Sequence, residues 1–209
     1  VAAYARAARA WSKLFNTRSI EAIESQRAQN DALERQARKA EKRALAIVRK
    51  ATADYLGELA RLCRDLGGRI MVLGSPMQRN LLPGVSHEKG MELAADCIRL
   101  ALPVLEECSV TLAVEPLGPV EGNFLNTADL GKQLCEMVGS PNCRLHLDCK
   151  AMATEAKPIP QIIRENAKVM AHFHANDPNM RGPGMGELDF IPIFQALAEI
   201  DYRGWVSVE

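Results

Sequence analysis

The sequence predicts an α/β fold in which about five parallel strands alternate with helices, preceded by a helical N-terminal segment. Two observations support this prediction. From residue 51 onward, short apolar runs alternate with amphipathic stretches, which is the pattern of βαβ units with parallel strand pairing. Residues 1–50 differ from the rest because they contain neither Gly nor Pro. With 209 residues, of which 47% are hydrophobic, the chain can bury a sizeable core.

The N-terminal segment, residues 1–50, has the composition of a helix. From about Ser19 it is rich in Ala, Glu, Gln, Arg and Lys, which are strong helix formers, and Ser19 can act as an N-cap. Its apolar positions are mostly Ala, so we expect one or two long, solvent-exposed helices that serve as a scaffold or docking element. We therefore divide the chain into this segment and an α/β domain, residues 51–209.

The α/β domain is expected to contain several amphipathic helices. They are predicted at residues 51–66, 88–107, 128–138, 161–166 and 190–200. Gly67 and Gly68 should end the first of these helices, since Gly readily adopts the left-handed conformation that follows a helix. Pro103 should kink or shorten the second, because it lacks an N–H and its ring clashes with the preceding turn.

Five short apolar runs are predicted to be strands. They lie at residues 70–73, 110–115, 144–148, 170–174 and 205–209. In parallel α/β sheets and barrels, functional groups gather where strands pass into the following loops. Four of these strands end on a group that can bind a metal ion, namely Glu115, Asp148, His174 and Glu209.

The four strand ends would face one small opening. Three carboxylates and one imidazole suit one divalent ion of intermediate hardness, such as Mn²⁺, Mg²⁺ or Co²⁺, with Zn²⁺ as a further candidate. Such an ion could polarise a substrate carbonyl and stabilise an enediolate, and a carboxylate could move the proton. Taken singly, a strand-end carboxylate such as Glu115 or Asp148 is more often a helix cap or a loop anchor than a functional group.

The histidines leave an alternative open. His172 and His174 flank Phe173 on one strand and face the same side, so one would bind the metal ion while the other packs beside it. His146 precedes Asp148 by two residues and has the same ambiguity, with core packing favoured.

Composition and charge argue against several classes of protein. Acidic and basic residues balance at 26 each, whereas nucleic-acid and anionic-membrane binders usually show a basic excess. The six cysteines include no Cys-x-x-Cys pair, as expected for reduced thiols. No apolar run approaches the roughly 20 residues of a membrane span, and residues 1–10 do not resemble a signal peptide. We expect a cytoplasmic protein.

Several segments together resemble the xylose isomerase-like TIM-barrel superfamily of sugar phosphate isomerases and epimerases. The segments are residues 114–116, 145–148, 172–177, 182–186 and 204–209. The resemblance is strongest to ketose 3-epimerases of the D-tagatose 3-epimerase type, with hydroxypyruvate isomerase as a relative. It implies a partial (β/α) TIM barrel whose five strands resemble strands four to eight, with the first three strands missing.

The resemblance also implies roles for individual residues. In that branch a Glu, an Asp, a His and a Glu at barrel strand ends hold one divalent metal ion, and the spacing here selects His174 as the histidine ligand. The two glutamates of the family act as the acid/base pair, which implies this role for Glu115 and Glu209. Glu121 matches a further family Glu near the substrate.

Two substrate contacts of the epimerases are replaced in this sequence. Ala151 stands where the family has a substrate-binding His, with Lys150 beside it. Met180 stands where the family has an Arg, and Arg181 follows. Lys150 or Arg181 could take over the substrate contacts.

We therefore predict a metal-dependent isomerase or epimerase of a small sugar, sugar phosphate or hydroxy-ketone that acts through an enediolate. The alternative is a non-catalytic barrel remnant that binds metal or a protein partner. A DNA-repair endonuclease of the same superfamily is disfavoured, because such enzymes use a three-metal cluster with many His ligands and this chain has four His. The edges of a five-strand sheet would need cover from the N-terminal helices or from a second chain, as in a homo-oligomer. Glu209 is the last residue of the sequence, so a free α-carboxylate is expected beside the site.

Overall fold

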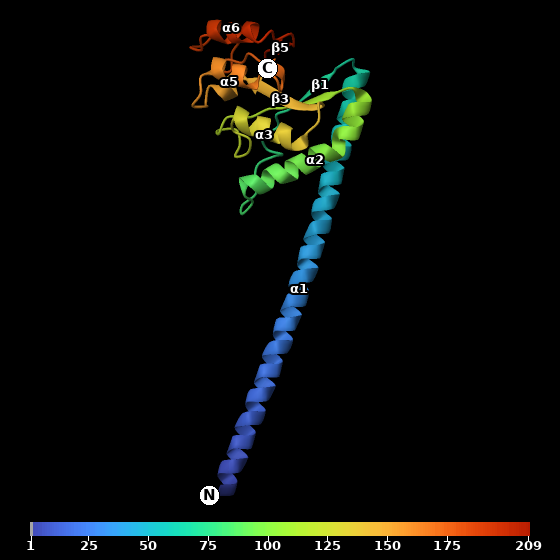
Figure 1. Cartoon of the computed structure of the whole chain (residues 1–209), viewed down its shortest axis with the longest axis vertical. Coiled ribbons are helices and arrows are strands. Elements are labelled where there is room, and N and C mark those ends of the chain that lie inside the picture. Colours follow the sequence, from blue (N-terminus) through green and yellow to red (C-terminus); the bar gives the residue numbers. More distant parts are fainter. Residues whose placement is uncertain (1) are drawn as a thin grey trace. The chain divides into compact units, whose positions relative to one another are not determined.

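The computed structural model describes residues 2–209, with side chains described except at 2–5, 7–8, 11–12, 14–16 and 18. The helices are α1 (Ala2–Asp65), α2 (His87–Cys108), α3 (Ala128–Val138), α4 (Cys149–Met152), α5 (Ile159–Asn166) and α6 (Ile191–Glu199). The strands are β1 (Ile70–Leu73), β2 (Thr111–Val114), β3 (Cys143–Asp148), β4 (Met170–His174) and β5 (Val206–Ser207). Figure 1 shows these elements along the chain.

The five strands form one parallel sheet, in which each strand pairs with the next along the chain in the order β1-β2-β3-β4-β5. This confirms the predicted α/β fold and the partial barrel of five strands. Because all strands run in one direction, their carboxyl ends meet at the same edge of the sheet. The last strand covers only Val206–Ser207, which is shorter than the predicted residues 205–209.

Helix α1 is continuous where the sequence suggested separate helices before and after residue 50. No Gly or Pro occurs between residues 1 and 56, so nothing interrupts the helix at that boundary. Residues up to 48 and residues 49–209 form two compact units. Side chains 20–48 are exposed except that of Ala32, as expected for a solvent-exposed helix. The domain boundary at residue 50 stays a prediction.

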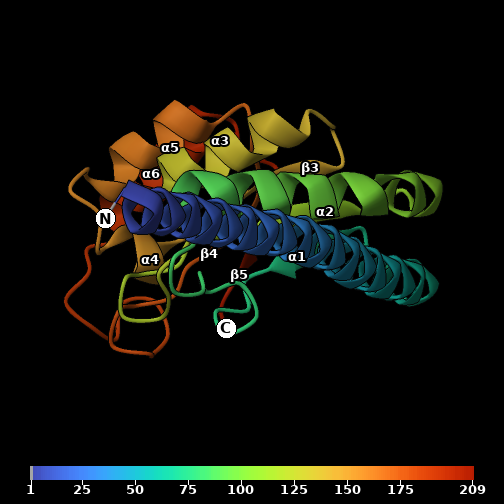
Figure 2. The same ribbon diagram turned by 90° about the horizontal axis from the view of Figure 1, so that it is seen from below.

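The two faces of the sheet differ in chemistry. Helices α2, α3, α5 and α6 lie on one side of the sheet in the unit of residues 49–209 (Figure 2). The large side chains that point toward these helices are fully buried, namely Leu112, Leu145, Leu147 and Phe173. Since successive side chains of a strand point to opposite faces, the intervening His146, Asp148, His172 and His174 lie on the other face.

Two helices differ from expectation. Helix α2 runs through Pro103 to Cys108, so this proline does not shorten it. The short helix α4 was not predicted, and it begins where the Asp148 carboxylate accepts a hydrogen bond from the Lys150 backbone N–H at 2.8 Å. Such a contact satisfies a backbone donor that the first turn leaves unpaired.

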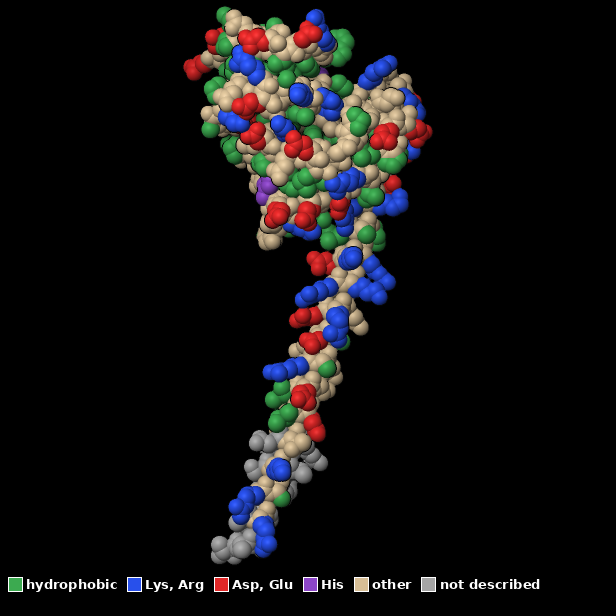
Figure 3. All heavy atoms as spheres, viewed as in Figure 1, with side chains coloured by type: hydrophobic (Ala, Val, Ile, Leu, Met, Phe, Trp, Pro, Cys, Tyr) green, Lys and Arg blue, Asp and Glu red, His purple; other side chains and the backbone are tan. Residues whose placement is uncertain are grey.

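The surface reflects the charge balance of the sequence. On the face seen in Figure 3, basic and acidic side chains are interspersed. All six cysteines are free. Among the described residues, no helix is both long and apolar enough to span a bilayer.

Candidate metal centre

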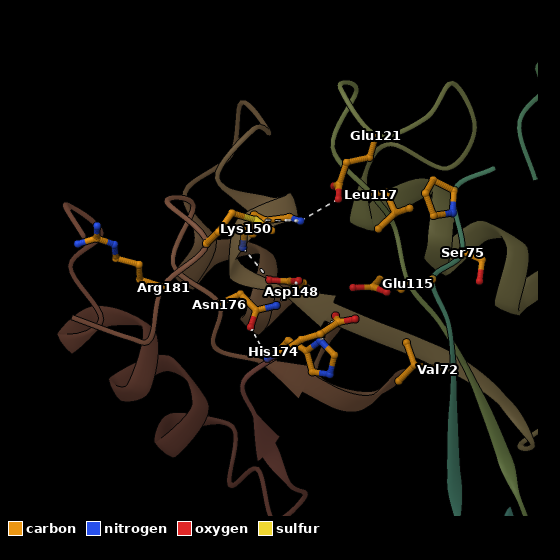
Figure 4. A pocket seen from close by; sticks show the side chains of 14 residues that line it. Val72, Ser75, Glu115, Leu117, Glu121, Asp148, Lys150, His174, Asn176 and Arg181 are labelled. Atoms are coloured by element: carbon orange, nitrogen blue, oxygen red, sulfur yellow. Dashed lines mark hydrogen bonds and ion pairs between the residues drawn. The ribbon is translucent and has the colours of Figure 1, made fainter. Parts of the chain in front are cut away.

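The structure brings together the four residues expected to bind a metal ion. Asp148 and His174 are the last residues of β3 and β4, Glu115 follows β2 directly, and Glu209 lies two residues beyond β5. One ligand atom of each residue lies within 4.8 Å of those of the other three. Figure 4 shows Glu115, Asp148 and His174 around one opening, and Glu209 lines the same cavity.

Burial shapes the electrostatics of this group. Glu115, Asp148 and His174 are buried, whereas the Glu209 side chain is 72% exposed. Burial raises the pKa of Glu115 to about 7, opposed by His174 and reinforced by Glu209. Burial likewise raises the pKa of Asp148 to about 6 and lowers the pKa of His174. Carboxylates placed close together in a poorly solvated site are costly to ionise, and a divalent cation would offset that cost.

The donor set fits a divalent ion. Three carboxylates with one imidazole are hard-to-intermediate ligands. The His174 Nδ1 atom is buried, makes no hydrogen bond to any described residue, and lies 3.4 Å from Glu209 Oε2. A ring nitrogen in that position can offer its lone pair to an ion that the carboxylates also contact. Glu115, Asp148, His174 and Glu209 could therefore hold one ion together.

Asn176, which the sequence analysis did not select, connects two of these residues. Its Nδ2 donates to Asp148 Oδ2 at 2.8 Å, and its Oδ1 accepts the Glu209 backbone N–H at 2.8 Å. The amide is buried, so both contacts are shielded from water. Partners of this kind hold ligands in the orientation that binding needs. A polar residue two positions after His174 was the available signal for this role.

Replacing Asn176 with Ala is expected to weaken divalent-metal binding by about 10–100-fold, the usual cost of losing a residue that orients metal ligands. The variant leaves Asp148 and the Glu209 backbone without their buried partner. Calorimetric titration with Mn²⁺ measures the effect. Asn142→Ala is the matched control, because Asn142 donates to the Val110 carbonyl at 2.9 Å and takes no part in the site. Equal losses in both variants would contradict an orienting role for Asn176.

Glu115 is accommodated by Gly74, which directly follows the neighbouring strand β1. A Cβ atom at Gly74 would lie only 1.8 Å from Glu115 Oε2, so a larger residue there would displace the carboxylate. The Glu115 backbone N–H donates to the Leu73 carbonyl at 3.1 Å, which holds it next to β1. Its other carboxylate oxygen lies 3.4 Å from Nδ1 of the fully buried His146. Gly74 therefore controls where the Glu115 carboxylate sits.

The predicted substrate-binding residues line the same cavity, whose volume is about 510 Å³. Lys150 Nζ donates to Glu121 Oε1 at 2.8 Å, and Glu121 Oε2 accepts the Gly118 backbone N–H at 3.2 Å. This contact with Glu121 raises the pKa of Lys150. Arg181 also borders the cavity, but its guanidinium points away from Glu115, Asp148 and His174 (Figure 4). Of the two predicted substitutes, Lys150 is therefore the one beside the opening.

The raised pKa values predict a pH dependence. Carboxylates must lose their protons to bind a metal ion, so Mn²⁺ affinity should rise between about pH 5 and about pH 8. The pKa of Glu115 is raised from 4.5 to about 7, so the metal-free native state holds a proton that the unfolded state has released. The unfolding free energy of the metal-free protein should therefore fall as pH rises from about 4.5 to about 7. Titration calorimetry and urea unfolding at several pH values measure both trends.

Glu115→Gln is the control for this pH dependence, because the amide does not titrate. The variant should lose most of the fall in unfolding free energy between about pH 4.5 and about pH 7, the window set by the Glu115 shift. A variant that keeps the full dependence would assign it to other groups.

A family model described as xylose isomerase-like TIM barrel matches residues 43–209. An L-ribulose 3-epimerase of Mesorhizobium japonicum is 32% identical over 160 residues, which cover 75% of this chain and 52% of that protein. A D-psicose 3-epimerase of Ruminiclostridium cellulolyticum is 31% identical over 118 residues, which cover 56% of this chain and 40% of that protein. The chain thus spans about half or less of the length of these curated relatives.

Solved structures of two epimerases have a similar fold. The structure of an L-ribulose 3-epimerase aligns with a TM-score of 0.68 at 30% identity, covering 76% of this chain and 53% of that one. A D-psicose 3-epimerase from Clostridium cellulolyticum H10, solved with D-tagatose, aligns with a TM-score of 0.70 at 26% identity. That alignment covers 77% of this chain and 56% of the other. The five-stranded sheet and its helices correspond to about half of these barrels.

Proposed function

Because the chain belongs to the xylose isomerase-like TIM-barrel family, we propose that it carries one divalent-metal centre and isomerises or epimerises a small sugar, sugar phosphate or hydroxy-ketone. One observation carries the proposal. Metal-binding atoms from the ends of four successive strands lie within 4.8 Å of one another on a scaffold otherwise similar to ketose 3-epimerases. We propose Mn²⁺, Mg²⁺ or Co²⁺ as the ion, with Zn²⁺ as a further candidate, since carboxylates form most of the site.

Glu115 and Glu209 are the proposed proton-transfer pair. An ion bound by Glu115, Asp148, His174 and Glu209 would supply Lewis-acid polarisation of a substrate carbonyl. One glutamate takes the proton from the carbon beside that carbonyl, which leaves an enediolate, and the other returns a proton to the opposite face or to the neighbouring carbon. Burial raises the pKa of Glu115 to about 7 in the metal-free site, whereas a bound ion would favour the carboxylate form that accepts a proton.

Glu121 and Lys150 are proposed to bind substrate hydroxyl groups. Their ion pair lies at the cavity and is about three-quarters buried. A carboxylate that accepts and an ammonium that donates can together recognise neighbouring hydroxyls of a polyol. Arg181 could join them only if its side chain turned toward the opening. The printed names of the relatives, which are epimerases of ribulose and psicose, support a ketose-like substrate.

Two further predictions accompany this proposal. The six free cysteines support a reducing location such as the cytoplasm. β1 and β5 are the edge strands of the described sheet, and each pairs with one neighbouring strand. Val72 on β1 and Val206 on β5 are partly exposed. These exposed edges support a homo-oligomer in which a second copy of the chain covers them.

Calorimetric titration of the 209-residue protein with Mn²⁺ tests the centre. We expect saturable binding of one ion per chain, lost in a Glu115→Gln/Asp148→Asn variant that keeps the circular dichroism spectrum of the parent. Epimerisation would then be assayed on a panel of ketoses and ketose phosphates. A folded protein that binds no Mn²⁺ would contradict the metal centre and with it the enzymatic proposal.

A further inference from the structure

Three of the four histidines of the chain lie close together beside the candidate carboxylate ligands. His146 on β3 and His172 and His174 on β4 have ring centroids 4.1 Å (His146–His174), 5.1 Å (His172–His174) and 5.3 Å (His146–His172) apart. One ring nitrogen of each lies within 4.8 Å of those of the other two. All three residues are buried, and His146 is fully so. Three imidazoles thus converge in a region that water reaches poorly.

Each ring has one nitrogen beside an oxygen atom. His146 Nδ1 lies 3.4 Å from Glu115 Oε1, and His174 Nδ1 lies 3.4 Å from Glu209 Oε2. His172 Nε2 lies 3.2 Å from Ser207 Oγ, where the ring N–H can donate to the hydroxyl. Of these three contacts, the one with Ser207 is a hydrogen bond, which can fix the His172 ring and leave its Nδ1 directed at an ion, as partners of metal-binding histidines commonly do.

Four ring nitrogens of this cluster form no hydrogen bond. Among the described residues, these buried atoms are His146 Nδ1 and Nε2, His172 Nδ1 and His174 Nδ1. A buried polar atom without a partner costs free energy, so it calls for an occupant such as a metal ion or water. His146 Nε2 on β3 and His172 Nδ1 on β4, together with a ring nitrogen of His174, form the donor set of a three-histidine metal site.

We propose that His146, His172 and His174 bind one borderline transition-metal ion such as Zn²⁺, at a site distinct from the carboxylate centre but sharing His174 with it. An all-imidazole set favours Zn²⁺, Ni²⁺ or Cu²⁺ over Mg²⁺ and Mn²⁺, which prefer oxygen ligands. Zn–N bonds of about 2.0–2.1 Å place tetrahedral ligand nitrogens about 3.4 Å apart, so the rings need to approach by at most about 1.4 Å. The proposal of this zinc site does not depend on whether the protein is catalytically active.

The test begins with the Glu115→Gln/Asp148→Asn variant, which removes two ligands of the carboxylate centre and no histidine. Equilibrium dialysis with Zn²⁺ and elemental analysis should still find one ion per chain. Co²⁺ should give the visible absorption of a nitrogen-bound, low-coordinate ion. Adding His172→Gln should weaken Zn²⁺ binding at least tenfold. His87→Gln is the matched control, because this fourth histidine packs against Phe124, with a ring-centroid distance of 5.1 Å, outside the cluster.

Two outcomes would overturn the proposal. One is a folded Glu115→Gln/Asp148→Asn protein that binds no Zn²⁺, and the other is unchanged Zn²⁺ affinity after His172→Gln. If His172→Gln fails to fold, Ser207→Ala replaces it, and loss of this orienting hydroxyl should weaken Zn²⁺ binding by about 10–100-fold. Unchanged affinity in the Ser207 variant would equally overturn the site. Since these measurements use Zn²⁺ in a protein without the carboxylate centre, their failure is separable from failure to bind Mn²⁺.

Discussion

Replacing Glu209 with Gln is expected to lower the rate of epimerisation by about 10²–10⁴-fold, the usual loss when a general acid or base is removed. The change also exchanges a charged, proposed metal ligand for a neutral amide. Because the Glu209 side chain is 72% exposed, the free energy of unfolding should change by no more than about 0.5 kcal/mol. Initial rates with Mn²⁺ and the best ketose substrate, measured beside urea unfolding, separate the two effects.

Glu199→Gln is the matched control for this experiment. Glu199 is also an exposed glutamate, but it pairs with Arg164 at 2.6 Å rather than with the candidate centre. Its removal should leave the rate unchanged. A Glu209 variant that epimerises at the parental rate would refute proton transfer by this residue. A parent that binds Mn²⁺ but turns over no ketose would instead support the non-catalytic alternative.

Replacing Phe173 with Ala is expected to lower the free energy of unfolding by about 3–5 kcal/mol, the range observed for aromatic-to-Ala changes in protein cores. Phe173 is fully buried in β4 and pairs in register with Leu147 of β3 and Val206 of β5. Removing its ring would leave a cavity between the sheet and the helices. Urea unfolding of both proteins, with slopes compared to check that the transition stays two-state, measures the loss.

Phe194→Ala controls for the loss of an aromatic ring in general. Phe194 lies on α6 and is 43% exposed, so its removal should cost clearly less than removal of Phe173. Because Phe173 separates His172 from His174, the folded fraction of the Phe173 variant should also bind Mn²⁺ more weakly. Equal losses of stability in the two variants would contradict a larger contribution of the buried Phe173 ring than of the exposed Phe194 ring.

Much of the fold follows from local sequence patterns. Each buried strand is a short apolar run, and Thr127 caps α3 by accepting the Leu130 N–H at 3.3 Å. The order of the strands in the sheet equals their order in the chain, so the strand ends could be placed side by side without long-range information. The roles of Glu115 and Asp148 as ligands are still a prediction, but their proximity follows from this simple topology.

Features that depend on contacts between distant segments could not be predicted in this way. Asn176 lies 28 residues from Asp148 and 33 from the Glu209 backbone, and nothing in its immediate sequence specifies either partner. The direction of Arg181 depends on a tight turn in which Asn179 Oδ1 accepts the Arg181 N–H at 2.9 Å and Met180 has a positive φ of 65°. The two candidate substitutes, Lys150 and Arg181, were therefore indistinguishable before the loop was seen.

Gly74 has a consequence for interpreting related sequences. It supplies no ligand atom, yet a single methyl group at this position would occupy the space of the Glu115 carboxylate. A homologue that retains all four proposed ligand residues but carries a larger residue here would keep the sequence signature of the proposed centre while the glutamate equivalent to Glu115 is forced aside. Surveys that infer activity from the ligand residues alone would count such a protein as an enzyme. The residue at this position therefore belongs in the criterion by which working members of the family are separated from inactive ones.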